Sequence, residues 1–214
     1  MNPETIDSRM RLLCEDRPFG RINATQIKVL KHGRVAGAIV GGNLTLMLES
    51  VGIPYEVQTE NKILFIEEIS ENKDTILDCL KALKNKGKLD GIKGVIFGRM
   101  TDCFQDEDEF VKSMKKVFTK MKYPILHNFP SGHTEDIARA HFTLPFGVPV
   151  LMDTKKRLVK VMEPAVNYMK TYDFALSCDF DVEEKFVRLL KENCKKKGLS
   201  FIWVREKNVK KVLK

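Results

Sequence analysis

Short apolar runs alternate with amphipathic stretches over most of this chain. Residues 62–68, KILFIEE, and 94–98, GVIFG, are apolar at successive positions, which is typical of strands buried on both faces. Residues 72–86 and 106–121 repeat apolar side chains at helical spacing. The resulting strand–helix–strand–helix order predicts an α/β fold with a mixed, largely parallel sheet flanked by helices.

The rest of the first 165 residues adds shorter elements. Residues 27–41 indicate two strands about a His-Gly turn. After the GGN turn, LTLMLESVG indicates a short helix, with Asn43 as its N-cap and Gly52 near its end. The remaining expected strands are 124–129, 142–152 and 157–162.

The pattern restarts near residue 165. Residues 171–204 alternate as strand, helix and strand, and the inner face of the helix is expected to carry Phe186, Leu189, Leu190 and Cys194. We therefore divide the chain into a domain over 1–168 and a segment over 169–214. The second segment is an incomplete strand–helix–strand extension or the start of another domain.

Composition and charge narrow the function classes. The 214 residues are 43% hydrophobic and 31% charged, so the chain can bury a sizeable core. Its net charge of +8 is uneven, because residues 170–214 hold 12 Lys/Arg against 7 Asp/Glu and leave 25 against 22 in the first 169. That near balance argues against nucleic acid as the main partner.

Several other classes are disfavoured. No apolar run approaches the ~20 residues that span a bilayer, and the N-terminus lacks a signal-peptide core, so we expect a cytoplasmic protein with no membrane partner. Five cysteines without a CxxC pair argue against a disulfide framework. We expect no metal either, since tetrahedral ligand spacing is absent from the set His127, His133, His141, Asp102 and Cys103.

Two residues at strand ends are candidates for chemistry. Glu67 ends the strand over 62–68, and His133 lies in the Pro/Gly turn after the strand over 124–129. The carboxyl ends of parallel strands share one sheet edge, so the two side chains can meet there. A carboxylate that orients a general-base histidine is part of a hydrolase triad. A solvated strand end and an exposed turn histidine are the alternative, which these residues alone leave open.

A larger pattern surrounds this pair. The segments IVGGNLTLMLESVGIPYE, KILFIEE, LKALKNKGKLDGIKGVIFGRMTDC, YPILHNFPSGH and TLPFGVPVLMDT follow one another in this order. Together, from about residue 20 to about 163, they resemble the C-terminal half of the LD-carboxypeptidase family. These are serine peptidases of the S66 type and include the microcin C self-immunity peptidases. The resemblance implies a Ser–His–Glu triad that cleaves an amide bond beside a free carboxylate, typically in a murein tetrapeptide.

The resemblance also assigns roles. It makes Glu67 the orienting acid and His133 the base, and it places Gly41, Gly42 and Asn43 in a substrate-binding turn. Glu68 is expected to be a supporting or solvated carboxylate. The family further implies a homo-oligomer that binds a small peptide and needs no cofactor.

The nucleophile is the departure from the family. In the family, the nucleophilic serine lies on a sharp turn of an N-terminal domain. No G-x-S-x-G elbow occurs in these 214 residues. Ser131 neighbours the site but has neither the elbow nor an obvious oxyanion hole. We therefore expect this chain to be inactive alone, as a truncated or split enzyme whose Ser-bearing N-terminal half is missing or is a separate chain.

Two alternatives remain open. The chain could be a non-catalytic peptide-binding or interaction module, or its segment 171–204 could begin a nucleotide-binding or ligase-like domain. Because the family buries its cleft between two domains, we also expect an exposed apolar patch where the partner domain would sit. That patch would comprise Ile39, Val40, Leu44, Phe129 and Phe146.

Overall fold

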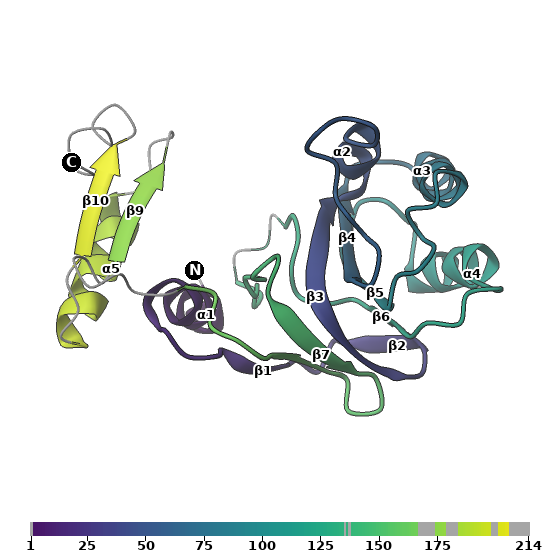
Figure 1. Cartoon of the computed structure of the whole chain (residues 1–214). Helices are drawn as coiled ribbons and strands as arrows, with labels where there is room; N and C mark the ends of the chain where they lie inside the picture. Colours follow the sequence, from purple (N-terminus) through teal and green to yellow (C-terminus); the bar gives the residue numbers. More distant parts are fainter. Residues whose placement is uncertain are drawn as a thin grey trace.

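A computed structural model describes residues 2–134, 136, 138–166, 174–178, 184–197 and 201–205 (Figure 1). Its helices are α1 (Pro3–Cys14), α2 (Leu44–Glu49), α3 (Lys73–Asn85), α4 (Glu107–Val117) and α5 (Glu184–Lys196). Eight described strands form one sheet, in the order β1 (Gly20–Asn23), β8 (Leu158–Val161), β7 (Pro149–Asp153), β3 (Arg34–Asn43), β4 (Ile63–Ile69), β5 (Gly94–Thr101), β6 (Ile125–His127) and β2 (Lys28–Lys31). A second sheet pairs β9 (Phe174–Cys178) with β10 (Phe201–Arg205) in parallel.

The main sheet is mixed, as predicted. Strands β3, β4, β5 and β6 run parallel, whereas β1, β8, β7 and β2 pair antiparallel with their neighbours. The α/β class with flanking helices is therefore confirmed. The strand expected over 142–152 is largely wrong, because regular pairing starts only at Pro149. Residues 142–148 instead form a loop that reaches the middle of β3, where the Ile39 amide donates to the Val148 carbonyl at 3.1 Å.

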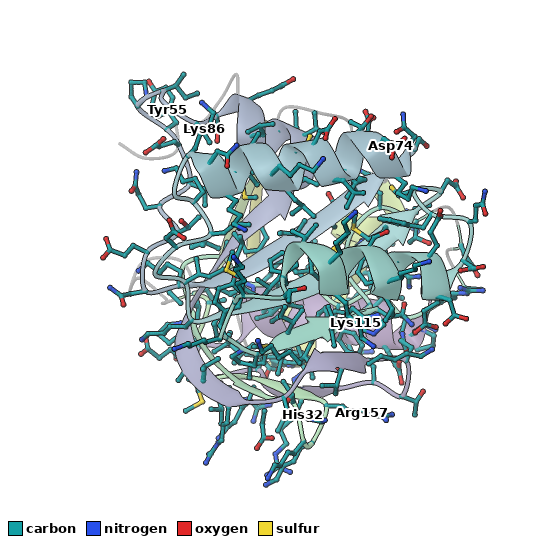
Figure 2. All side chains as sticks on the ribbon, turned by 90° about the vertical axis from the view of Figure 1, so that its right-hand side faces the viewer. His32, Tyr55, Asp74, Lys86, Lys115 and Arg157 are labelled. Carbon is teal, nitrogen blue, oxygen red and sulfur yellow. The ribbon has the colours of Figure 1, made fainter. Side chains whose placement is uncertain are left out.

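The two strands at the His-Gly turn exist but are not paired with each other. β2 pairs with β6, while β3 pairs with β7 along its first half and with β4 along its second. Because only two residues join β2 to β3, the sheet curls and the turn forms a corner. Thr154 fixes this corner, since its amide donates to the Gly33 carbonyl at 3.1 Å. Figure 2 shows His32 and Arg157, from the two adjoining turns, at the same end of the molecule.

The helices α1 to α4 begin at residues whose side chains cap the first turn. The side chains of Asn43, Asn72 and Asp106 accept hydrogen bonds from amides in the first turns of α2, α3 and α4. Helix α1, for which the sequence analysis made no prediction, begins in the same way. Its N-cap, Asn2, accepts a bond from the Glu4 amide at 2.9 Å, and Pro3 occupies the first helical position.

Strand alternation separates two cores. In β4, Leu64 and Ile66 pack toward α2, α3 and α4, which cover one face of the sheet (Figure 1). Ile63 and Phe65 pack on the opposite face, with residues of β7 and β8. Since successive side chains point to opposite faces, the next two residues of this strand, both glutamates, face different cores.

The C-terminal segment contacts the rest of the chain through α1. Leu190 and Cys194 of α5 are fully buried against Met10 and Cys14 of α1. The predicted strand–helix–strand order is confirmed in β9, α5 and β10 (Figure 1). The proposed boundary at 168/169 and the Phe186 side chain lie outside the described residues.

The expected apolar patch is largely wrong. Ile39, Leu44 and Phe129 are fully buried by the chain itself, and Val40 is partly buried beside the helices. Phe146 is the member of that set that stays exposed, at 50%. No helix in the described part of the chain is long and apolar enough to cross a membrane.

Candidate active site

Glu67 and His133 meet at the carboxyl edge of the parallel strands. Glu67 Oε2 lies 2.8 Å from His133 Nδ1 and 2.9 Å from the His133 backbone nitrogen. The Glu67 side chain is 7% exposed and that of His133 is 58% exposed. The carboxylate is thus anchored inside the protein while the imidazole reaches solvent. The prediction that these two side chains are within hydrogen-bonding reach is confirmed.

This contact fixes the chemistry of the imidazole. A carboxylate at Nδ1 accepts a hydrogen bond from the Nδ1–H group and so holds the proton on Nδ1, which leaves the lone pair on the other ring nitrogen, Nε2. Nε2 is then the group that can take a proton from a neighbouring hydroxyl. Such a carboxylate also stabilises the imidazolium that forms after proton transfer.

The turn that carries His133 is tied to β5. The Phe129 amide donates to the Phe97 carbonyl at 3.0 Å, and the Arg99 amide donates to the Ser131 carbonyl at 2.8 Å. The Thr101 hydroxyl donates to the His133 carbonyl at 2.6 Å. These three bonds tie alternate residues from Phe129 to His133 to β5, so β5 acts as a rigid support for the turn.

Gly132 allows the close approach of the pair. Its φ is +109°, and a Cβ built there would lie 2.8 Å from Glu67 Cβ and 2.9 Å from Glu67 Oε2. Any side chain at this position would push the carboxylate away from His133. The glycine before the histidine is therefore part of the geometry of the site.

Glu68 has a different environment, on the helix-covered face. It accepts hydrogen bonds from the Thr45 amide at 2.9 Å, the Thr45 hydroxyl at 2.8 Å and the Ile69 amide at 3.0 Å, and also from the Asn43 side chain. Burial by itself raises the pKa of Glu68, but the hydrogen bonds from Ile69 and Thr45 outweigh it and leave the pKa below its usual value. Glu68 is buried and supports the start of α2, so its interpretation as a solvated residue is wrong.

The three residues of the GGN turn have separate surroundings. A Cβ on Gly41 would lie 1.9 Å from the Phe65 carbonyl oxygen, so this glycine is needed for β3 to pack against β4. Gly42 lines the hollow beside the pair. Asn43 caps α2 through Oδ1 and donates to Glu68 through Nδ2. Of the three, Gly42 is thus placed to contact a ligand, and the substrate-binding role of this turn stays a prediction.

A hollow of about 320 Å³ opens beside His133. Phe65 and Phe146, with ring centroids 5.9 Å apart, contribute an apolar wall. The hollow is lined by Gly42, Phe65, Glu67, Ser131, Gly132, His133, His141, Thr143, Leu144 and Phe146. It therefore places an apolar surface next to a candidate base.

His141 is a site residue that the sequence analysis considered only as a metal ligand. It lines the hollow with His133, and burial together with the charges of Arg9 and Arg99 lowers its pKa. It is therefore neutral near pH 7 and can donate or accept a hydrogen bond. The signal available in the sequence was its position between the His133 turn and the TLPFG segment. Among the described residues, no group of three His, Cys, Asp or Glu side chains could hold a metal ion.

The site contains a candidate base but no paired nucleophile. Ser131 lines the hollow and is buried. Within the described ranges, the His133 ring is hydrogen-bonded to Glu67 and to no hydroxyl or thiol group. The described chain thus brings together the acid and the base that the sequence predicted and leaves the third triad position without a partner.

A carboxylate-oriented histidine at the carboxyl edge of an α/β sheet is the arrangement of an acid–base pair in triad hydrolases. The class that fold and site define is therefore an α/β domain of hydrolase type. Residues 36–152 match the family described as the LD-carboxypeptidase C-terminal domain. The chain belongs to this family.

Relatives with assigned names agree with this membership. A probable murein peptide carboxypeptidase of Bacillus subtilis is 31% identical over 171 residues, covering 78% of this chain and 52% of the relative. A putative carboxypeptidase of Streptomyces coelicolor is 28% identical over 138 residues, covering 64% of this chain and 43% of the relative. The chain spans about half the length of the curated relatives it matches.

Solved structures show the same fold. A muramoyltetrapeptide carboxypeptidase from Oxalobacter formigenes superimposes with a TM-score of 0.62 at 21% identity, covering 75% of this chain and 54% of the other. The microcin C7 self-immunity protein MccF gives a TM-score of 0.58 at 24% identity, covering 66% of this chain and 42% of the other.

Proposed function

We propose that this chain supplies the general base and its orienting acid to a serine-type carboxypeptidase. The reaction is hydrolysis of an amide bond near the C-terminus of murein-derived or other small peptides. The observation that carries the proposal is the 2.8 Å contact between Glu67 Oε2 and His133 Nδ1. The nucleophile comes from a Ser-bearing α/β domain outside these 214 residues.

In the first half of the proposed mechanism, Nε2 of His133 takes part in two proton transfers. As the serine oxygen attacks the peptide carbonyl, Nε2 takes the hydroxyl proton, and Glu67 stabilises the imidazolium. The imidazolium then gives this proton to the nitrogen of the leaving amino acid as the amide bond breaks. In the second half, Nε2 takes a proton from a water molecule as the water oxygen attacks the acyl carbon. Nε2 then returns this proton to the serine oxygen as the bond between the serine and the acyl group breaks.

The hollow supports a small peptide as the substrate. Phe65, Leu144 and Phe146 line it with apolar surface next to the base. Such a surface fits an amino-acid side chain beside the scissile bond. The names of the relatives, which are murein peptide and muramoyltetrapeptide carboxypeptidases, point to the same substrate class. A homo-oligomer and a cytoplasmic location, both implied by the resemblance, belong to this proposal.

Complementation tests the proposal directly. The chain is mixed with a Ser-bearing N-terminal half, and release of the terminal amino acid from a murein tetrapeptide is followed by mass spectrometry. We expect no turnover by this chain alone and turnover by the mixture. In the mixture, His133→Ala lowers kcat by a factor on the order of 10⁴, and Glu67→Gln lowers it by somewhat less. Robust turnover by the chain alone, abolished in Ser131→Ala, contradicts the proposal.

A second function, peptide binding without hydrolysis, is favoured by one observation. The chain buries Ile39, Leu44 and Phe129 by itself, so its core is closed in the absence of a second domain. A binding module predicts that the isolated chain binds the tetrapeptide by calorimetry, and that no Ser-bearing half confers turnover. The two functions therefore give opposite results in the complementation experiment.

A further inference from the structure

A second hollow lies on the other face of the sheet. It measures about 200 Å³ and is lined by Gly98, Met100, Phe104, Asp106, Glu107, Phe110, His127 and Asn128. These residues come from the carboxyl ends of β5 and β6 and from the start of α4. In β6, Leu126 packs in the core on the His133 side, while Ile125 packs in the helix-covered core. Alternation therefore directs His127 to the helix side, away from the candidate active site.

His127 is an unusual buried group. The residue is 4% exposed, and among the residues that the structure describes no hydrogen bond involves either nitrogen of its ring. Its ring stacks on Phe110, with centroids 5.3 Å apart and planes at 33°. The described buried side-chain atoms that lack a hydrogen-bond partner are Arg99 Nε and Tyr123 OH, so the unpaired nitrogens of His127 are not sealed in the core but open to the hollow that the ring lines, where a ligand atom can reach them.

The protonation state of His127 determines which hydrogen bonds its ring can form with a ligand. Burial lowers its pKa; the charge of Glu107 opposes this shift and that of Lys28 adds to it. The ring is therefore neutral near pH 7 and presents one donor and one acceptor. A ligand that meets either nitrogen removes the cost of leaving it unpaired.

The other walls determine what kind of ligand fits. Phe104 and Phe110 meet edge to face with centroids 5.2 Å apart, which leaves aromatic surface on one side of the hollow. Asp106 and Glu107 add two carboxylates, and Lys28 is paired with Glu107. Aromatic faces and carboxylates attract cations and repel anions. Phosphates and carboxylates are thus disfavoured in this hollow.

A metal ion does not explain the hollow. Among the described residues, no three metal-binding side chains converge, at this place or elsewhere. Asp106 Oδ1 is already engaged with the Glu109 amide at 2.8 Å, as the N-cap of α4. The polar groups fit an organic ligand with a flat ring better than they fit an ion.

We propose that this hollow is a second ligand site, which takes a small aromatic ring carrying a cationic amine. The ring lies against Phe104 and Phe110, and a polar ring substituent pairs with His127. The ammonium group lies at the carboxylates of Asp106 and Glu107. The site uses neither Glu67 nor His133, so it stands apart from the proposed peptidase function.

Tyramine, which joins a phenol ring to an amine, is the probe for this site. The whole chain is titrated with tyramine while its histidine ring signals are followed by NMR and the heat of binding by calorimetry. We expect saturable shifts of the His127 signals and unchanged signals from exposed His32. The matched probe 4-hydroxyphenylacetate, with the same ring and a carboxylate in place of the amine, is expected to bind at least tenfold more weakly.

Two variants localise the binding. His127→Gln and Phe104→Ala are each expected to weaken tyramine binding at least tenfold, and His32→Gln is the control that leaves it unchanged. Unaltered His133 signals show that a variant is still folded. Failure to bind millimolar tyramine, equal binding of both probes, shifts at His133 instead of His127, or indifference to both variants each overturns the proposal. None of these outcomes depends on peptidase activity.

Discussion

Glu67 and Glu68 are neighbours in sequence and lie in unlike environments. Strand alternation sends Glu67 to the face where His133 lies and Glu68 to the start of α2. The family resemblance could distinguish them only by order along the chain. The structure distinguishes them by partners, since one carboxylate holds an imidazole and the other holds backbone amides.

The tautomer of His133 should depend on Glu67. In the neutral imidazole of the wild-type chain, the proton is expected on Nδ1. Glu67→Ala removes its acceptor, so the proton should redistribute toward Nε2. Nitrogen-15 NMR of the ring reports this directly, with His32 as the exposed reference. A wild-type His133 protonated mainly on Nε2 contradicts the geometry of the site.

Gly132 gives a second prediction for single residues. Gly132→Ala should displace Glu67, because the new Cβ would lie 2.8 Å from Glu67 Cβ. The matched control is Gly20→Ala, whose φ is also positive, at +84°, and whose Cβ would meet nothing within 4 Å. In both variants the positive φ of an alanine is expected to lower the free energy of unfolding by about 1–2 kcal/mol. Only Gly132→Ala should also alter the His133 ring signals, and equal spectra in the two variants contradict the prediction.

Secondary-structure elements were predictable where local signals were strong. The N-cap predicted at Asn43 and the helical spacing over 72–86 and 106–121 mark helices that the structure confirms, and the apolar runs mark β4 and β5. The pairing of β2 with β6 was not predictable, because a curled sheet depends on contacts between distant residues. The apolar residues in 142–148 suggested a strand, but this segment is a loop that forms backbone hydrogen bonds with Ile39 of β3.

Glu68 should couple the stability of the α2 region to pH. Its pKa is lower in the folded protein than its ordinary value of 4.5. The stabilisation is therefore present above about pH 4.5, and it is lost as the pH falls through the folded pKa. Glu68→Gln should lower the free energy of unfolding by about 1–3 kcal/mol at pH 7.

Denaturant unfolding of wild type and Glu68→Gln, measured from pH 7 down to pH 3, checks this linkage. The difference between the two proteins should shrink below pH 4.5, because wild-type Glu68 becomes protonated there. Glu49→Gln, a change to a carboxylate in α2, is the control and should show a smaller difference. A Glu68→Gln difference that stays constant over the whole pH range contradicts the assignment.

At the scale of the whole molecule, the candidate site was more predictable than the surface around it. Glu67 and His133 follow strands whose parallel order fixes where their ends lie. Burial of Leu44 and Phe129 depends on how α2 and the loop before β7 close over the sheet, which no local pattern specifies. His127 was missed as a ligand-facing residue for the same reason, since only the fold brings α4 over β6.

The contact between α1 and α5 carries the last prediction. Leu190 and Cys194 are buried against Met10 and Cys14, and the two sulfur atoms of the cysteines lie 3.8 Å apart. Burial, with the neighbouring Cys194, raises the pKa of Cys14 to about 12, so this thiol stays protonated and behaves as an apolar group. The contact is therefore held by apolar packing, with the ion pair between Glu15 and Lys197 at its edge.

Leu190→Asp should separate α5 from α1, because it places a carboxylate against buried methyl and sulfur groups. Hydrogen exchange followed by mass spectrometry should show lost protection in α5 and along the Met10 face of α1, with β4 and β5 unchanged. Lys191→Asp, on the exposed side of the same helix, is the matched control and should leave protection in α1 intact. If Leu190→Asp instead exposes the central strands, the C-terminal segment is integral to the fold of the first domain, and the division of the chain near residue 168 is wrong.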